Sequence, residues 1–288
     1  MPAIDKSIRE IRGLDRRALP DGLLRGGEPV VLRGLVDDWP LARASAASSQ
    51  QAIDHLRRYA RGAEVATLLG SSEVRSRLFY NSDVDGIDFR TEQPHLGAVL
   101  NAVQQQLKGT DPATAYLGST TVRTFFPGLD AVHRVELGDR NPLHSLWIGN
   151  RTRIPAHQDL PDNLACVAAG CRRVTLLPPD QSANLYIGPL DSTPAAQAIS
   201  LVDFAAPDLQ RFPRFADAMR HAQVAVLEPG DALYVPSLWW HCVEALDTFN
   251  VLLNYWWRQS PDHMDKPANA LPPAVLAARD LPLRERAA

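Results

Sequence analysis

The sequence predicts a mainly β protein, a jelly roll with helical N-terminal and peripheral additions. From about residue 115, short β-type segments separated by turn-forming residues follow one another, which is typical of a sandwich or barrel. The residues before them show helical periodicity instead. The chain has 288 residues, enough to bury one large core, and it contains neither an internal repeat nor a low-complexity linker.

The N-terminal part is predicted to mix strands with helices. Glu28–Leu35 is a nearly continuous apolar segment and indicates a buried strand. Gln51–Ala60 carries apolar side chains at helical spacing. A second helix is expected after Pro94, because a proline is tolerated in the first turn and apolar residues then recur at i, i+3, i+4 and i+7. Those apolar residues are Leu96, Val99, Leu100, Val103 and Leu107.

The rest of the chain is predicted to be β-rich. Turns such as Pro178–Asp180 and Pro229–Asp231 separate the β-type segments. A helical insertion is expected at Asp208–Ala222, where apolar side chains lie on one face. The predicted strands are Leu146–Ile148, Arg173–Leu177, Val224–Leu227, Ala232–Val235 and Val251–Trp256.

Charge and composition argue against several classes of protein. The net charge is −3 with both signs interspersed, so no nucleic-acid footprint is expected. No apolar run approaches the roughly 18 residues that span a bilayer, and the N-terminus lacks the apolar centre of a signal peptide. We therefore expect a cytoplasmic protein without a membrane partner. Three cysteines without CxxC spacing argue against a disulfide framework or a zinc–thiolate site, and we interpret them as small buried residues.

His157, Asp159 and His241 are the candidate metal ligands. Residues two apart in a strand point to the same face, so His157 and Asp159 can present an imidazole and a carboxylate together. His241 follows a β-type run and a turn, and a jelly roll can bring it beside them. Two histidines and one carboxylate leave coordination positions open, as in non-haem Fe(II) oxygenases. A closed structural zinc site would require a fourth protein ligand.

The metal assignment needs further support, because an isolated HxD pattern occurs by chance in many proteins. Several other segments supply that support by their sequence and their order along the chain. In these segments the sequence resembles the cupin-like JmjC-related 2-oxoglutarate oxygenases, the group that includes the factor-inhibiting-HIF asparaginyl hydroxylase. The similar stretches are Pro29–Trp39, Ala115–Ser119, Trp147–Asp159, Arg173–Tyr186, Val202–Phe215 and Glu228–Trp256. The remaining histidines, interpreted as surface or satisfied core residues, are His55, His95, His133, His144, His221 and His263.

The resemblance implies a double-stranded β-helix and an iron site. Residues 1–288 would form a single cupin-like JmjC domain, with its core at about 115–257, additions at 1–114 and a helical tail at 258–288. His157, Asp159 and His241 fall on the iron ligands of the family. The implied cofactors are Fe(II) and 2-oxoglutarate, with oxygen as the second co-substrate.

The resemblance also assigns co-substrate contacts. Arg172 stands where the family usually has a lysine that pairs with the distal carboxylate of 2-oxoglutarate, and a guanidinium can bind a carboxylate bidentately. The alternative is a solvated strand arginine. Tyr116 matches a tyrosine that assists the same carboxylate. Asn163 and Asn254 match asparagines near the iron, although buried asparagines could equally brace the barrel. Ile154 replaces a threonine of the asparaginyl hydroxylase.

Substrate contacts are assigned at two residues. Trp256 matches an aromatic residue at the substrate entrance, and Gln197 lies in a loop that carries a substrate-binding glutamine in the asparaginyl hydroxylase. The substrate itself, a protein side chain or a small molecule, is open. Homodimerisation through C-terminal helices, as in that enzyme, would have to use the short segment after Trp257, where Ala274–Arg279 is the expected helix.

The leading hypothesis is therefore a 2-oxoglutarate-dependent dioxygenase that hydroxylates its substrate. One alternative is a metal-binding or sensing cupin module without turnover, suggested by Arg172 and Ile154. The other is a cupin dioxygenase that uses the metal without 2-oxoglutarate.

Overall fold

The computed structural model describes residues 4, 6–70, 77–107, 114–189, 193, 197–260, 264 and 267–286. The chain divides into a large unit, Met1–Trp257, and a small unit, Arg258–Ala288. Both candidate ligand segments belong to the large unit.

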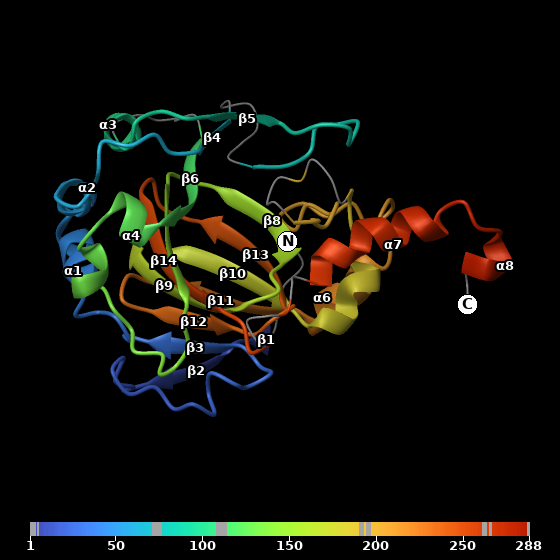
Figure 1. The fold of residues 1–288 in the computed structure, drawn as a ribbon, viewed down its shortest axis with the longest axis horizontal. Coiled ribbons are helices and arrows are strands. Elements are labelled where there is room, and N and C mark those ends of the chain that lie inside the picture. The colour runs from blue at the N-terminus through green and yellow to red at the C-terminus, as the bar shows by residue number, and fades with distance from the viewer. Residues whose placement is uncertain are drawn as a thin grey trace. The chain divides into compact units, whose positions relative to one another are not determined.

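Two β-sheets stack on one another in the large unit (Figure 1). The minor sheet consists, in spatial order, of β1 (Lys6–Ser7), β11 (Gln223–Leu227), β10 (Arg172–Leu177), β13 (Trp240–Ala245) and β8 (Arg153–Gln158). The major sheet consists of β2 (Arg9–Arg12), β3 (Val30–Arg33), β12 (Ala232–Val235), β9 (Asp162–Ala169), β14 (Asn250–Trp257), β7 (Leu143–Gly149), β6 (Thr114–Thr121), β4 (Thr67–Gly70) and β5 (Phe89–Glu92).

Strands remote in sequence lie side by side in both sheets. β10 pairs antiparallel with β11 and β13, and β9 pairs antiparallel with β12 and β14. From β7 to β10, and again from β11 to β14, successive strands alternate between the two sheets. The predicted mainly β jelly roll is confirmed.

The space between the sheets is an apolar core that becomes polar at the candidate site. Val167 of the major sheet and Val174 and Leu176 of the minor sheet belong to one buried cluster. Because side chains alternate along a strand, Arg172 shares the inward face of β10 with Val174 and Leu176. Its charged side chain is therefore placed inside the barrel.

The other face of the major sheet packs against the N-terminal helices. This largest buried cluster joins residues of β9 and β14 to Trp39, Ile53 and Leu100. The helices on this side of the sheet are α1 (Pro40–Ala47), α2 (Ser49–Arg57), α3 (Leu96–Gln106), α4 (Val122–Phe125) and α5 (Leu129–Val132). The first four are labelled at the left of Figure 1.

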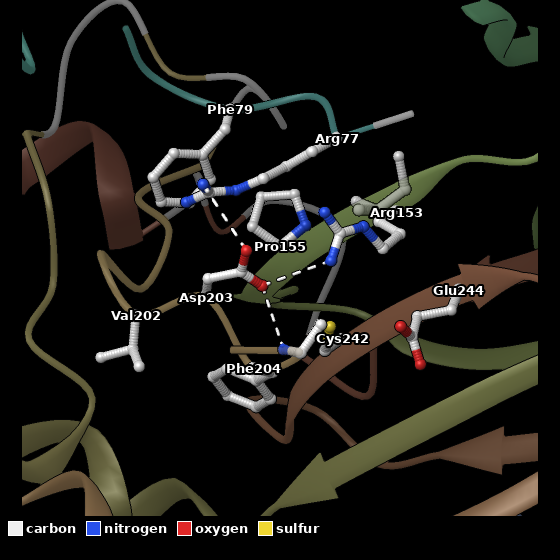
Figure 2. Close-up of a pocket in the computed structure, with 11 residues that line it drawn as sticks. Arg77, Phe79, Arg153, Pro155, Val202, Asp203, Phe204, Cys242 and Glu244 are labelled. Carbon is white, nitrogen blue, oxygen red and sulfur yellow. Dashed lines mark hydrogen bonds and ion pairs between the residues drawn. The ribbon is translucent and has the colours of Figure 1, made fainter. Parts of the chain in front are cut away.

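The outer face of the minor sheet carries a small pocket (Figure 2). At its edge, the Asp203 carboxylate lies 3.6 Å from Arg77 Nη1 and 3.5 Å from Arg153 Nη1. Cys242 and Glu244 of β13 contribute to its lining. These two residues alternate with His241, so the pocket opens on the face opposite to the candidate ligand. The same face also packs against α6 (Phe215–His221) and η2 (Pro179–Asn184).

Most predicted elements agree with the structure, but the helical insertion does not in its first half. The helix predicted from Leu96 is α3, and the one predicted at Gln51–Ala60 is α2, which begins two residues earlier. The prediction of a helix over Asp208–Ala222 is wrong before Phe215, where α6 begins. Pro213 explains the difference, because proline lacks the N–H of a helical hydrogen bond and disfavours a helical conformation for the preceding residue.

The small unit is helical where it is described. It contains η3 (Pro267–Ala270), α7 (Leu271–Ala278) and α8 (Leu283–Arg286), in the region of the predicted helical tail. The limits predicted for the β core, 115–257, stay a prediction. None of the helices in the described ranges combines the length and the apolar character needed to cross a bilayer.

Candidate metal centre

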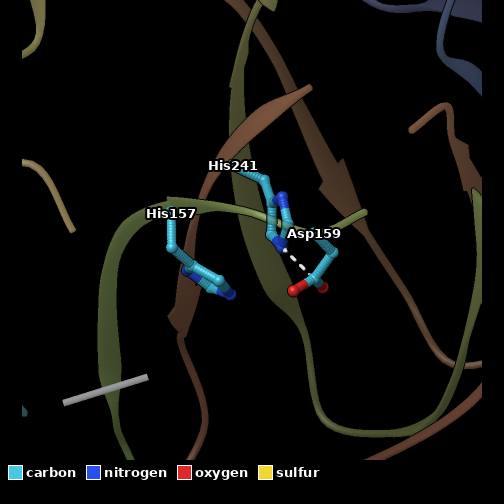
Figure 3. Close-up of side chains that lie close together, drawn as sticks. All are labelled: His157, Asp159 and His241. Atoms are coloured by element: carbon cyan, nitrogen blue, oxygen red, sulfur yellow. Dashed lines mark ion pairs between the residues drawn. The ribbon is translucent and has the colours of Figure 1, made fainter. Parts of the chain in front are cut away.

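The three predicted metal ligands come together at one end of the minor sheet (Figure 3). His157 of β8 and His241 of β13 are directly opposite one another in the antiparallel pair. Asp159 is the first residue after β8 and lies in the following loop. The spacing argument had placed it in the strand. Figure 3 shows its carboxylate turned toward the two imidazoles.

The side chains are close enough to share one cation. One ligand atom from each residue lies within 4.8 Å of the other two. His241 Nε2 is 3.6 Å from Asp159 Oδ2, and the two imidazole centroids are 4.2 Å apart. Within the described residues, this is the group of histidine, cysteine and carboxylate side chains that could hold a metal ion.

Backbone carbonyls fix which imidazole nitrogen can bind a metal. His157 Nδ1 lies 2.9 Å from the Pro155 carbonyl oxygen, and His241 Nδ1 lies 3.0 Å from the carbonyl oxygen of Trp239. A carbonyl only accepts hydrogen bonds, so each Nδ1 must carry the proton. The lone pair of each imidazole is then on Nε2, which is how metal-binding histidines are usually held.

The loop that carries Asp159 is tied to the turn that precedes His241. The Leu238 N–H donates to the Asp159 carbonyl oxygen at 2.9 Å, and the Ser237 hydroxyl donates to the carbonyl of Leu160 at 2.5 Å. The Ser237 N–H also donates to Asp162 Oδ1 at 3.0 Å. The backbone around the ligands is thus braced without a metal.

Burial favours the neutral, metal-binding form of His157. Desolvation, followed by the neighbouring His241, lowers the pKa of His157 to about 4, while the Asp159 carboxylate opposes this change. Two neutral imidazoles and a carboxylate are the ligand set of non-haem iron sites. The residues present therefore fit a divalent transition-metal ion.

Arg172 is buried inside the barrel, and no carboxylate among the described residues forms an ion pair with it. The residue is only 2% exposed, and its Nε and Nη2 atoms make no hydrogen bond within the described residues. Its alternative interpretation as a solvated strand arginine does not hold. Burial lowers the pKa of Arg172, and burial raises that of Tyr116 to about 12, with the positive charge of Arg172 opposing the increase. The two side chains are therefore electrostatically coupled.

Asn163 and Asn254 form a hydrogen-bonded pair together with a tryptophan. Asn254 Nδ2 lies 3.4 Å from Asn163 Oδ1, and the Trp147 indole N–H donates to Asn254 Oδ1 at 2.8 Å. Asn254 is 1% and Asn163 is 8% exposed. The sequence assigned Trp147 to packing, because only the register of β7 against β14 brings it beside Asn254.

Comparison with known proteins gives the family. The cupin-like domain family matches residues 17–263 of the chain. The chain belongs to the cupin-like domain family. The domain is of the JmjC type, and this family of iron- and 2-oxoglutarate-dependent proteins includes hydroxylases and demethylases.

The curated relatives of this cupin-like protein are longer than the chain. HSPB1-associated protein 1 of Rattus norvegicus is 29% identical over 267 residues, which cover 85% of this chain and 51% of the relative. Lysine-specific demethylase JMJ31 of Arabidopsis thaliana is 33% identical over 135 residues, 44% of this chain and 24% of the relative. tRNA wybutosine-synthesizing protein 5 of Danio rerio is 37% identical over 134 residues, 45% of this chain and 37% of the relative. The chain thus spans about half or less of their lengths.

The two predicted substrate residues of the cupin-like protein differ in their surroundings. Trp256 is partly buried and meets Trp147 edge-to-face, with ring centroids 5.7 Å apart. Gln197 is exposed, two residues before Ile199, which forms a bridge with His157. Both assignments stay predictions.

Proposed function

We propose that this cupin-like protein is an Fe(II)- and 2-oxoglutarate-dependent oxygenase that hydroxylates a protein side chain or a small molecule. The observation that carries the proposal is the convergence of His157, Asp159 and His241, with each Nδ1 bound to a carbonyl and each Nε2 left for the metal. Three protein ligands leave the positions that a chelating keto acid and oxygen require.

His157, Asp159 and His241 would hold the iron, which supplies oxygen activation when bound. The protein's own residues bind and orient the reactants. Arg172, on the inward face of β10, would hold the distal carboxylate of 2-oxoglutarate, and the Tyr116 hydroxyl would donate to the same carboxylate. A guanidinium whose donors are free and desolvated suits such an acceptor, because charge-assisted hydrogen bonds strengthen where water is excluded.

Asn163 and Asn254 are proposed to border the other end of the co-substrate, near the iron. Trp256 and Gln197 are proposed to contact the substrate. The likeness to the factor-inhibiting-HIF asparaginyl hydroxylase supports these assignments at matching positions, whereas Arg172 and Ile154 depart from it. One relative is named as a lysine-specific demethylase and another as a tRNA wybutosine-synthesizing protein, so family membership does not select the substrate.

The decisive experiment measures succinate. Purified protein with Fe(II), ascorbate, oxygen and 2-oxoglutarate should release succinate, even slowly without substrate, and the His157→Ala variant should not. Calorimetry on Mn(II)-loaded protein should show 2-oxoglutarate binding that Arg172→Met abolishes. If the loaded wild type binds no 2-oxoglutarate, the proposal fails in favour of a sensing module. Oxygen consumption without the keto acid would instead indicate a 2-oxoglutarate-independent dioxygenase.

A further inference from the structure

We infer that Trp147 is a positioning residue that sets which atoms Asn254 and Asn163 present to the co-substrate. The inference deepens the proposed function and rests on it for the identity of the ligand. The hydrogen bonds on which the inference depends join side chains of the protein and are present without metal or co-substrate.

The indole of Trp147 lies among the residues assigned to the co-substrate and to the entrance. Its N–H donates to Asn254 Oδ1 at 2.8 Å. Its ring centroid is 5.8 Å from that of Tyr116 and 5.7 Å from that of Trp256. A Cβ on Gly118 would lie 3.2 Å from Trp147 Cζ3 and 3.6 Å from Tyr116 Cε1. The missing side chain of Gly118 thus allows both rings to lie against β6.

The indole fixes the direction of the hydrogen bonds. An asparagine amide can rotate by half a turn and exchange its oxygen and nitrogen, but an indole N–H is only a donor. Asn254 must therefore turn Oδ1 to Trp147 and Nδ2 to Asn163, whose Oδ1 accepts at 3.4 Å. The opposite orientation would place two buried donors against each other and leave the indole unpaired.

The direction of these hydrogen bonds determines which atoms of Asn163 are available to a ligand. With its oxygen engaged by Asn254, Asn163 has its amide hydrogens available, and within the described residues Asn163 Nδ2 donates no hydrogen bond. Asn163 is the fourth residue after Asp159 and the second residue of β9. A keto-acid carboxylate only accepts hydrogen bonds, so an asparagine that offers N–H groups matches it and one that offers oxygen repels it.

Two substitutions separate the hydrogen bond from the packing of the ring. Trp147→Phe keeps an aromatic ring but removes the donor, and Trp147→His keeps an N–H at the equivalent ring position but removes the second ring. We expect Trp147→Phe to weaken 2-oxoglutarate binding to Mn(II)-loaded protein by about tenfold, the effect of one buried hydrogen bond. The apparent KM for 2-oxoglutarate should rise alike, with kcat nearly unchanged. Trp147→His should recover most of the affinity.

A double-mutant cycle tests whether Trp147 acts through Asn254. If it does, Trp147→Phe has little further effect on 2-oxoglutarate affinity once Asn254→Ala is present, and the two losses do not add. Trp240→Phe is the matched control. It deletes an indole bond of 2.9 Å to Ser182 Oγ, on the outer face of the minor sheet, and should leave the affinity unchanged.

A measurement without metal or co-substrate separates this inference from the proposed function. In metal-free protein labelled with ¹⁵N, the side-chain amide signals of Asn163 and Asn254 should be single in the wild type and shifted or doubled in Trp147→Phe. Unchanged amide signals together with unchanged 2-oxoglutarate affinity would overturn the role of Trp147. A wild type that binds no 2-oxoglutarate would overturn the proposed function alone. If Trp147→Phe does not fold, Trp147→His compared with Asn254→Ala decides by the same signals.

Discussion

At the scale of single residues, Arg172 places a positive charge in a buried environment. It carries a guanidinium into the barrel, and no carboxylate forms an ion pair with it within the described residues. A buried charge without a partner costs folding free energy, which a bound anion would offset. Under the proposed function, affinity for the co-substrate and stability of the free protein would therefore be coupled at Arg172.

Arg172→Met should stabilise the ligand-free protein while it removes 2-oxoglutarate binding. Methionine fills a similar volume without a charge, so we expect the free energy of unfolding to rise by about 1–3 kcal/mol. Urea unfolding of metal-free protein measures this. Arg172→Lys, which keeps the charge, should show a smaller gain. A less stable Arg172→Met variant would mean that the guanidinium already has a partner in the folded protein.

The HxD spacing correctly predicted that His157 and Asp159 lie close together, although Asp159 is in the loop after β8 and not in the strand. Arg172 was singled out by the family resemblance, and its burial inside the barrel comes from the structure. Other roles depend on which strands become neighbours. The carbonyl of Trp239, which orients His241, and the indole of Trp147 act through pairings that no local pattern encodes.

At the scale of elements, the turn before β13 is strained where it holds the ligand loop. Leu238 has a φ of +66°, in the left-handed region that residues with a Cβ disfavour, and its side chain is 41% exposed. Its N–H nevertheless binds the Asp159 carbonyl. The backbone conformation is thus imposed by its neighbours on either side of the site.

Leu238→Gly should therefore be more stable than Leu238→Ala. Glycine adopts a positive φ without the steric cost, and its larger entropy loss on folding cancels only part of the gain. We expect a difference of about 0.5–1 kcal/mol between the two variants in thermal or urea unfolding. Equal stabilities would show that this turn is not strained.

Gly170 links the sheets and tolerates no side chain. It stands between β9 and β10 with a φ of +68°, and a Cβ there would lie 2.3 Å from the Phe249 carbonyl oxygen. Gly170→Ala should cost more than about 3 kcal/mol of unfolding free energy, since it combines strain with a clash against backbone. Gly27→Ala is the control, because its Cβ would meet nothing within 4 Å. Similar unfolding midpoints for the two variants would contradict the expected clash.

At the scale of the whole molecule, a buried histidine couples the N-terminal helices to pH. His133 is fully buried, accepts a hydrogen bond from the Leu41 N–H at Nε2 and has Nδ1 3.0 Å from the Leu129 carbonyl. Burial lowers its pKa to about 4, and the nearby histidines 55 and 144 act in the same direction. Protonation would set a new N–H of His133 against that of Leu41.

Stability of the metal-free protein should consequently fall between about pH 6.5 and 4. In that range His133 is protonated in the unfolded chain but neutral in the folded protein. Its contribution to stability is therefore fully present above pH 6.5 and is lost as the pH decreases toward 4. The loss is about 3 kcal/mol from this residue. Urea unfolding at several pH values should show a shallower decrease for His133→Gln. An equal decrease would assign the effect to other groups.

The overall architecture was predictable because turn chemistry and strand composition agree along the second half of the chain. β12 was predicted residue for residue. β9 was not predicted, because all eight of its residues are buried and the alternation that identifies a half-exposed strand is absent. The prediction of a helix over Asp208–Ala222 was wrong before Phe215, because it gave the apolar periodicity more weight than the helix-breaking Pro213.

The pairing of His157 with His241 has a consequence for how the chain reaches its native state. The two imidazoles converge only in one alignment of β8 against β13. A slip of β13 by one residue would present Trp240 or Cys242 to the interior and turn His241 outward. A bound metal ion would therefore stabilise only the native alignment of β8 and β13, because a misaligned pair does not bring the two imidazoles together.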